Sequence, residues 1–287
     1  MSAAGLDADD VIAVIRRGVT EDLGVVGDLT SMATIGEHAR IDAAYVARQD
    51  GVLAGAPVLM AVYEVCAGDR AQLEPELPDG APLERGTRIA TVSGDARSVL
   101  SVERLSLNLL GHLSGIATIT NMWVQAVDGT TARIRDTRKT TPGLRDLEKY
   151  AVRCGGGVNH RRGLDDAILI KDNHIASAGG VGAALDRVAA AYPGSQVTIQ
   201  VEVDTLEQLD EALDRGAREI LLDNFPVEQL TIAVERVHAR APDVHLESSG
   251  GLQLANARAV ALTGVDYLAV GALTHSSPSL DIGLDAL

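Results

Sequence analysis

Positively charged side chains are concentrated between Arg133 and His174, although the whole chain has a formal net charge of −15. Several of them directly follow apolar stretches that are typical of strands. Arg138 and Lys139 come after I-R-D-T, and Lys171 follows A-I-L-I. Residues just past strand ends are where α/β enzymes hold their binding and catalytic groups. We therefore interpret this segment as a site for a small anion within an acidic protein.

Two further candidates for the anion site follow a triple glycine. His160 and Arg161 come after G-G-G-V-N, and this position does not fit a helix exterior. Arg145, Lys149 and Arg153 are instead spaced at i, i+4, which is typical of the solvated face of a helix. We therefore assign His160 and Arg161 to the site and the three helical cations to the surface.

Two acids end successive predicted strands, Glu202 in V-E-V-D and Asp223 in L-L-D-N. Mg²⁺ keeps most of its waters and takes few protein ligands, so the pair suits a Mg²⁺ that is carried by a polyphosphate. The same acids suit an oxocarbenium-like centre, as in glycosyl transfer. The alternative is that they pair with nearby cations for structure alone.

Glycines mark a candidate phosphate site. The string L-E-S-S-G-G-L lies between a strand and a helix, where the N–H groups of Ser249, Gly250 and Gly251 would point at a phosphate from a helix N-terminus. Gly271, in the string V-G-A-L-T-H, could add a second contact. An ordinary helix cap with a glycine turn is the alternative for this motif.

The remaining histidines and the cysteines are weaker signals. Two cysteines are too few for a disulfide framework or a zinc site, so we expect free thiols in a reducing compartment. Four histidines are better explained as hydrogen-bonded structural groups. The cysteines are Cys66 and Cys154, and the histidines are His112, His174, His245 and His275.

The composition narrows the class of protein. Aromatic residues make up only 2%, which disfavours stacking on nucleic-acid bases, and the negative net charge disfavours a polyanionic partner. No apolar run reaches the roughly 18 residues of a membrane span. The segment M-S-A-A-G-L-D-A-D-D lacks the apolar region of a signal peptide. We therefore expect a cytoplasmic protein with no nucleic-acid or membrane partner.

An α/β architecture with parallel strands must position these groups. From Thr131 onward six apolar stretches alternate with amphipathic helical ones, which predicts a βα repeat. Six strands in this length favour a barrel over an open doubly wound sheet, and no G-x-G-x-x-G or P-loop motif occurs. The strands are A-R-I-R-D, A-I-L-I-K, V-T-I-Q-V-E-V, E-I-L-L-D, V-H-L-E-S-S and Y-L-A-V-G-A.

The chain before this repeat predicts a separate domain. A helix should follow Asp7, short strands should occupy Ile41–Val46 and Gly51–Gly55, and a helix should start near Pro57. Further apolar segments at helical spacing run from Ser101 onward. We predict an N-terminal domain over residues 1–112, a barrel over residues 113–273, and a C-terminal tail over residues 274–287 that packs back on the N-terminal domain.

Taken together, the motifs resemble the quinolinate phosphoribosyltransferase family. The resemblance extends over nearly the whole chain, and its strings occur in the family order. They are G-D-L-T-S, E-R-L-S-L-N-L-L-G-H-L-S-G-I-A-T, R-D-T-R-K-T-T-P-G-L-R, G-G-G-V-N-H-R, I-K-D-N-H, V-E-V-D, L-L-D-N, L-E-S-S-G-G and D-Y-L-A-V-G-A-L-T-H.

The resemblance implies a reaction, a fold and an assembly. Quinolinate and phosphoribosyl pyrophosphate would give nicotinate mononucleotide, pyrophosphate and CO₂ in de novo NAD biosynthesis, with Mg²⁺ as the cofactor. The implied fold is an N-terminal α/β sandwich followed by an incomplete α/β barrel. The implied assembly is a homodimer or higher homo-oligomer with shared active sites.

The resemblance also implies roles for individual residues. On the acid side, Arg138, Arg161 and Lys171 would hold the carboxylates of quinolinate, with His160 beside them. Arg104 would reach the site from a partner subunit, whereas Arg162 is expected at the surface.

On the ribose side, Glu202 and Asp223 would offset positive charge and meet the Mg²⁺ indirectly, through the pyrophosphate that carries it. Lys139 would support the loss of CO₂, and Thr137 would take part in substrate binding. The phosphate would be received by Ser249, Gly250, Gly251 and Gly271.

Two other enzyme classes stay open on the residues alone. A phosphoribosyltransferase for nicotinate or another small carboxylate would need one carboxylate site, whereas several cations favour a dicarboxylate. A βα-barrel aldolase would use Lys171 as a Schiff base, which requires an uncharged lysine that anion-binding neighbours would oppose.

Overall fold

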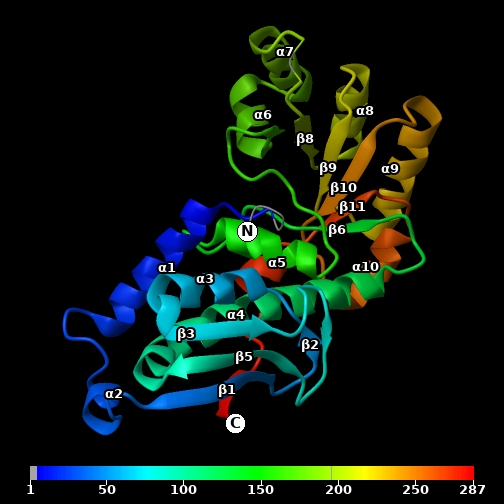
Figure 1. Ribbon diagram of the computed structural model, residues 1–287. Coiled ribbons are helices and arrows are strands. Elements are labelled where there is room, and N and C mark those ends of the chain that lie inside the picture. Colours follow the sequence, from blue (N-terminus) through cyan, green and yellow to red (C-terminus); the bar gives the residue numbers. More distant parts are fainter. Residues whose placement is uncertain (1–4, 195) are drawn as a thin grey trace. The chain divides into compact units, whose positions relative to one another are not determined.

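The structure is a computed structural model, in which residues 5–194 and 196–287 are described (Figure 1). The chain forms two compact units. The first contains the residues up to Asn121 together with Lys139–Gly156 and Ala272–Leu287, and the second contains Met122–Arg138 and Gly157–Gly271. The predicted boundary after residue 112 falls inside a single long helix, α4 (Ala96–Ala126), and the boundary between the two units, at Asn121–Met122, lies in the same helix.

The first unit is built on a four-stranded antiparallel sheet with the order β12-β1-β5-β3. The last strand, β12, comes from the C-terminal tail and pairs with β1 from the N-terminal part of the chain. The strands are β1 (Arg40–Ala47), β3 (Ala71–Pro75), β5 (Arg88–Asp95) and β12 (Ile282–Ala286), with a separate pair of β2 (Gly51–Val52) and β4 (Pro82–Leu83). The helices are α1 (Ala8–Leu23), α2 (Leu29–Thr34), α3 (Ala56–Cys66), the 3₁₀ helix η2 (Gly68–Arg70), α4, α5 (Arg145–Cys154) and α11 (Ala272–His275).

Local sequence signals account for the starts of the first helices. The Asp7 carboxylate accepts hydrogen bonds from the N–H groups of Asp9 and Asp10, so α1 begins after Asp7 as predicted. Asp79 accepts hydrogen bonds from the N–H groups of Gly55 and Ala56, both at 3.0 Å, and thereby caps α3 from a distant loop. Sequence spacing alone could not reveal this second cap, because its acceptor is more than twenty residues away.

Two glycines of α4 let the C-terminal segment cross the helix closely. A Cβ atom at Gly115 would overlap the carbonyl oxygen of Pro278, and one at Gly111 would lie 2.8 Å from the carbonyl oxygen of Leu280. The N–H group of Leu280 donates to the carbonyl oxygen of Gly111 at 2.9 Å. This crossing brings the tail to the position from which β12 pairs with β1.

The second unit is a parallel sheet with helices, and it confirms the predicted incomplete barrel. All six predicted strands are present in the order β6-β11-β10-β9-β8-β7, and the described residues show no ladder between the end strands β6 and β7. The strands are β6 (Arg133–Arg135), β7 (Ile168–Ile170), β8 (Ile199–Val203), β9 (Glu219–Asp223), β10 (His245–Ser249) and β11 (Tyr267–Ala269). The helices are α6 (Asp172–Ala178), α7 (Val181–Ala191), α8 (Leu206–Asp214), α9 (Val227–Arg240) and α10 (Leu254–Ala261).

Alternation along the strands separates an apolar outer face from a polar inner one. Val201 and Val203 of β8 are fully buried, as is Leu222 of β9, and these side chains form the core under the helices. The intervening positions of β8 carry Gln200 and Glu202. The interior of this barrel therefore carries several polar groups beside apolar ones such as Leu221, whereas most barrel interiors are filled by branched apolar side chains.

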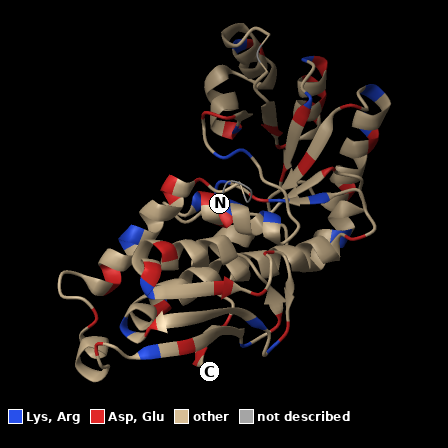
Figure 2. Cartoon of the chain, viewed as in Figure 1, with Lys and Arg blue, Asp and Glu red and all other residues tan. Residues whose placement is uncertain are grey.

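Ion pairs join the outer helices of the second unit. Arg240 of α9 contacts Asp210 at 2.7 Å and Asp214 at 2.6 Å, and Arg215 at the end of α8 contacts Asp186 of α7. Figure 2, in which the ribbon is coloured by charge, shows basic and acidic positions interspersed along these helices. Some of the acidic charge of the chain is thus neutralised locally on the surface. Within the described residues, no helix is both long and apolar enough to cross a membrane.

The close crossing at Gly115 gives a stability prediction. Gly115→Ala should lower the free energy of unfolding by about 1–3 kcal/mol, because the new methyl group overlaps the Pro278 carbonyl. The higher helix propensity of alanine, taken alone, would raise the free energy of unfolding by about 1 kcal/mol. Urea denaturation followed by circular dichroism measures the change. Gly36→Ala is the control, since nothing lies near its added methyl group, and a Gly115→Ala protein as stable as wild type would contradict the crossing.

Candidate active site

The carboxyl ends of the parallel strands bring the predicted polar residues to one edge of the second unit. Lys171 directly follows β7, Glu202 lies near the end of β8, and Asp223 ends β9. The strand register places Ser249, the last residue of β10, beside Asp223. Gly271 follows β11 by two residues. The predicted convergence of these groups follows directly from the sheet order.

Three of these charges influence one another. Burial raises the pKa of Glu202, the adjacent Lys171 ammonium opposes that rise, and the Asp223 carboxylate adds to it. Burial also raises the pKa of Asp204, and the charges of Asp223 and Asp172 add to that rise. A partly buried cluster of acids with perturbed pKa values is typical of a functional site.

Two guanidinium groups form the cationic side. Burial lowers the pKa of Arg161, and the positive charge of Arg138 lowers it further, so the two groups lie close enough to repel. The Arg161 Nη1 atom donates to the carbonyl oxygen of Ala167 at 2.9 Å, which fixes the side chain. Like charges held together in this way favour an anion with more than one negative group. Arg162 is exposed, as expected.

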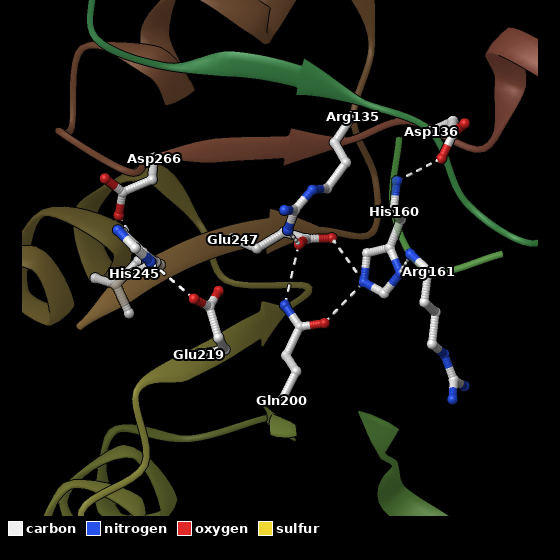
Figure 3. A network of polar contacts seen from close by, with 10 residues as sticks. Arg135, Asp136, His160, Arg161, Gln200, Glu219, His245, Glu247 and Asp266 are labelled. Atoms are coloured by element: carbon white, nitrogen blue, oxygen red, sulfur yellow. Dashed lines mark hydrogen bonds and ion pairs between the residues drawn. The ribbon is translucent and has the colours of Figure 1, made fainter. Parts of the chain in front are cut away.

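His160 is held by a hydrogen-bond network that includes residues not predicted from the sequence (Figure 3). Its Nε2 atom lies 2.7 Å from Gln200 Oε1, and Gln200 Nε2 donates to Glu247 Oε2 at 3.0 Å. Arg135 Nη1 donates to the same carboxylate oxygen at 2.7 Å. The buried Asp136 accepts from the backbone N–H of His160 at 2.7 Å. Strands β6, β8 and β10 thus fix one histidine together.

A cavity of about 360 Å³ adjoins this network. Its lining includes His160, Arg161 and Gln200, together with Thr198, which precedes β8, and Glu219, the first residue of β9. The lining does not include the strand-end acids. Within the described residues, the cavity therefore lies toward the amino-terminal ends of the strands, away from the strand-end acids. Of the predicted site residues, only His160 and Arg161 line it.

The glycine turn after β10 differs from the prediction. Gly250 and Gly251 adopt left-handed backbone angles, with φ values of +82° and +61°. A Cβ atom at Gly250 would overlap the side chain of Asn224, whose N–H donates to the carbonyl oxygen of Ser249 at 2.9 Å. Helix α10 begins only after its cap residue, Gln253. The N–H groups of the glycines therefore belong to a loop and not to a helix N-terminus, because two consecutive left-handed residues delay the helix.

Two predicted site residues belong to the first unit. Arg104 is exposed on α4, and Lys139 is exposed in the loop before α5. Thr274 Oγ1 donates to the carbonyl oxygen of Lys139 at 2.8 Å, and Glu148 accepts from the N–H of Thr141 at 3.1 Å. The loop that carries Lys139 is therefore fixed by hydrogen bonds at two points. Thr137 belongs to the second unit and is half-buried.

One surface assignment was wrong. Lys149 is 4% exposed, although Arg153 of the same helix is exposed and Arg145 is half-buried. The i, i+4 spacing indicated a solvated face, but α5 is buried over most of its circumference, from Leu147 to Val152. Charge spacing could not predict this burial, because it depends on packing by other elements.

The four weaker histidines are hydrogen-bonded, as predicted, and the cysteines are free. Burial raises the pKa of the Cys154 thiol to about 11 and also raises that of Cys66, so neither is an activated nucleophile. The histidine partners are His112 with Glu148, His174 with the N–H of Lys171, His245 with Glu219, and His275 with Ser276.

The protein has the architecture of an α/β-barrel enzyme, with charged residues gathered at its strand ends. Family models for quinolinate phosphoribosyl transferase match residues 28–114 (N-terminal domain) and 116–285 (C-terminal domain). The chain belongs to this family.

Individual relatives agree with the family models. The chain is 55% identical over 272 residues to the nicotinate-nucleotide pyrophosphorylase (carboxylating) of Mycobacterium leprae, covering 94% of this chain and 95% of that protein. A probable enzyme of the same name from Bacillus subtilis is 44% identical, covering 92% and 89%. The solved nicotinate-nucleotide pyrophosphorylase of Francisella tularensis superposes with a TM-score of 0.91 at 35% identity, covering 98% of each chain.

The raised pKa of Glu202 gives a prediction on stability against pH. An acid whose pKa rises on folding binds its proton more tightly in the folded state, so its ionised form lowers stability. This cost is absent well below the ordinary value of 4.5 and complete above the raised pKa. Glu202→Gln should therefore raise the melting temperature at pH 7, and the gain should vanish below about pH 4.

Glu207, on α8, is the matched control for this prediction. Hydrogen bonds from its own backbone N–H and from Thr205 lower the pKa of Glu207, so its ionised form stabilises the fold. Glu207→Gln should give no gain at pH 7. Melting curves of both variants between pH 4 and pH 8 make the comparison. An equal change for Glu202→Gln at every pH would contradict the burial argument.

Proposed function

We propose that this chain transfers a phosphoribosyl group from phosphoribosyl pyrophosphate to quinolinate and releases pyrophosphate and CO₂. The product would be nicotinate mononucleotide, a precursor in de novo NAD biosynthesis. The observation that carries the proposal is the partly buried pair of guanidinium groups, Arg138 and Arg161, beside the hydrogen-bonded His160. The word carboxylating in the relatives' names describes the same equation written in the opposite direction.

The acid side suits a dicarboxylate. Each guanidinium group can hold one carboxylate through two parallel hydrogen bonds. The Arg161 Nε atom is buried and lacks a hydrogen-bond partner among the described residues, which leaves a donor for a ligand. A single carboxylate, as in nicotinate, would leave part of this positive charge uncompensated. Quinolinate is therefore favoured over nicotinate.

The ribose side suits a cationic transition state. In the proposed first step, the pyridine nitrogen forms a bond to the anomeric carbon as the bond from that carbon to pyrophosphate breaks. Positive charge develops on the ribose during this step. Glu202 and Asp223 lie close enough to interact, and their carboxylates would offset that charge.

The second step would remove CO₂. The ring nitrogen is now cationic, so breaking the bond to the adjacent carboxylate leaves a carbanion that the nitrogen stabilises. A proton then replaces the lost carboxylate. Lys139, exposed on a loop that Thr274 and Glu148 hold, is the group we assign to supporting this step. Ser249 and the glycines after it would receive the phosphate.

The acids also fit a role for Mg²⁺ that is carried by pyrophosphate. The described residues include no group of three or more metal-ligating side chains. Glu202 and Asp223 provide two neighbouring carboxylates, and few protein ligands are what a phosphate-bound Mg²⁺ requires. When bound, the ion would neutralise charge on the leaving pyrophosphate.

The Schiff-base alternative is less well supported. An imine-forming lysine must be uncharged, usually through desolvation in an apolar pocket. Lys171 is exposed and lies beside the Glu202 carboxylate. This environment suits an anion-binding ammonium group better than a nucleophile.

We further propose a homodimer with shared sites in the cytoplasm. Arg104 is exposed on α4 in the first unit, where it is available to a second copy of the chain. The free thiols suit a reducing compartment.

Arg161→Ala tests the reaction and the acid site together. Wild-type protein with both substrates and Mg²⁺ should release CO₂ from quinolinate labelled at the 2-carboxylate and form nicotinate mononucleotide. Arg161→Ala should raise the KM for quinolinate at least about 100-fold, because it removes a partly buried charge that would pair with the substrate. The KM for phosphoribosyl pyrophosphate should change little.

Arg162→Ala is the matched control, since it removes the neighbouring exposed arginine, and its kinetics should stay within about twofold of wild type. Nucleotide formation from nicotinate without CO₂ would favour the related transferase. Trapping of substrate by borohydride would favour the aldolase.

Complementation tests the shared site. Arg104→Ala and Lys171→Ala should each be nearly inactive alone. Unfolded together and refolded as an equal mixture, they should recover about a quarter of wild-type activity, because one site in each heterodimer is intact. Each variant refolded by itself is the control. A mixture that stays inactive while wild type refolds would place Arg104 in the site of its own chain.

A further inference from the structure

The hydrogen bonds behind His160 form a directed chain from a buried charge to the acid site (Figure 3). Glu247 is 1% exposed on β10, and its Oε2 atom accepts from Arg135 Nη1 at 2.7 Å. The same oxygen accepts from Gln200 Nε2 at 3.0 Å. Gln200 Oε1 in turn lies 2.7 Å from His160 Nε2. A carboxylate can only accept hydrogen bonds, so the direction of every link is set from Glu247 outward.

This direction determines how Gln200 is oriented. The side-chain amide must turn its NH₂ group to Glu247, because its oxygen would face another oxygen there. Its carbonyl oxygen therefore faces the imidazole of His160. The opposite orientation would lose the bond to Glu247 and leave a buried carboxylate oxygen without this donor. Such a loss is costly in a buried site.

The orientation of Gln200 agrees with two other contacts that require the same tautomer of His160, the Arg161 N–H at Nδ1 and the Glu247 Oε1 atom 3.7 Å from Nε2. An amide oxygen can only accept, so the Nε2 atom of the ring must carry the proton. The other ring nitrogen, Nδ1, accepts from the backbone N–H of Arg161 at 2.7 Å. Asp136 holds the backbone N–H of His160 itself at 2.7 Å. The ring is thus fixed at both nitrogens and through the main chain.

We infer that Gln200, oriented by Glu247, is a positioning residue that holds the His160 ring at Nε2, so that Nδ1 can accept from the Arg161 N–H and Arg161 is placed for the acid substrate. The expected effect on the KM for quinolinate rests on the proposed function. The structural claim concerns only the imidazole ring of His160 and the side-chain amide of Gln200. If these polar residues only filled the barrel, the same hydrogen bonds would form, but changing Gln200 would not alter the affinity for quinolinate selectively.

Nitrogen NMR of the histidine side chains tests the structural part without substrate. In wild-type protein, the ring of His160 should show a protonated Nε2 and an unprotonated Nδ1 at pH 8. The spectrum of His160→Gln identifies the signal by its loss. A proton found on Nδ1 of His160 would overturn the inference at once.

Glu247→Gln tests the direction of the chain with almost no change in volume. An amide at position 247 can present either an oxygen or an NH₂ group to Gln200, so both orientations of Gln200 become possible. Where Gln200 turns its NH₂ group to the ring, Nε2 must accept and the bond from the Arg161 N–H to Nδ1 is lost, so the His160 signal should differ from that of wild type. A spectrum identical to that of wild type would show that the Arg161 N–H alone fixes the ring and would overturn the role of Gln200 and Glu247.

Gln200→Leu tests the consequence for binding. The KM for quinolinate should rise about tenfold, since His160 loses its acceptor. The KM for phosphoribosyl pyrophosphate should stay within about twofold, and kcat should change less than the quinolinate KM. His245→Gln is the control, because it breaks the separate contact of His245 with Glu219, and it should leave the quinolinate KM within about twofold.

The experiments distinguish a failure of the proposed function from a failure of the positioning role of Gln200. Wild-type protein that is inactive with quinolinate would refute the proposed function, while the NMR results would still decide the tautomer. Active wild-type protein with unchanged quinolinate KM in Gln200→Leu would refute the positioning role alone. A Gln200→Leu protein that melts before assay leaves the wild-type and Glu247→Gln spectra to decide.

Discussion

The free-energy cost of burying a charge inside a parallel barrel constrains which side chains the second unit places there. Glu247 is almost completely buried, and a carboxylate in such a position requires a cation and further donors. Arg135 provides the cation from β6, and Gln200 provides a donor from β8. The guanidinium group of Arg135 also lies 3.7 Å from the ring centroid of Tyr267 on β11, so the aromatic face shares in its charge. Four of the six strands are therefore tied together by one buried ion pair.

The same constraint separates two kinds of acid in this barrel. The Oε2 atom of Glu247 accepts hydrogen bonds from Arg135 and Gln200, and these bonds hold other residues in place, whereas its buried Oε1 atom has no hydrogen-bond partner among the described residues. Glu202 is only partly buried at the strand ends, and its pKa is raised because the protein compensates its charge incompletely. An acid that the fold leaves partly uncompensated is available to a positive charge that arrives with a substrate. Position along the strands thus separates the buried carboxylate of Glu247 from the strand-end carboxylate of Glu202.

The features predicted from the sequence are those that depend on neighbouring residues in the chain. Strand ends at Lys171, Glu202 and Asp223 could be predicted because apolar runs mark parallel strands and a polar residue marks their ends. Gln200 and Glu247 could not be recognised in the same way. They occupy the inward positions of their strands, where an isolated polar residue looks like ordinary solvent-facing alternation. Only the sheet order brings them together beside His160.

Long-range packing accounts for the other differences from prediction. Lys149 is buried because several elements surround α5, and spacing within one helix carries no information about them. The two apolar segments from Ser101 onward form one continuous helix that passes the expected domain boundary. The left-handed pair Gly250–Gly251 delays α10, although a strand followed by glycine and an apolar run is also typical of a direct helix start.

The pairing of β12 with β1 has a consequence for how the protein is made. A chain emerges from the ribosome with its N-terminus first, so β1 is available long before residues 282–286 are synthesised. Until then, one edge of the first sheet has no partner strand and exposes its backbone N–H and C=O groups. The strands of the second unit are all synthesised before the tail, so its parallel sheet can pair during translation. The first unit must instead wait for residues 282–286, and a ribosome that stops before they are made releases a protein with an open sheet edge.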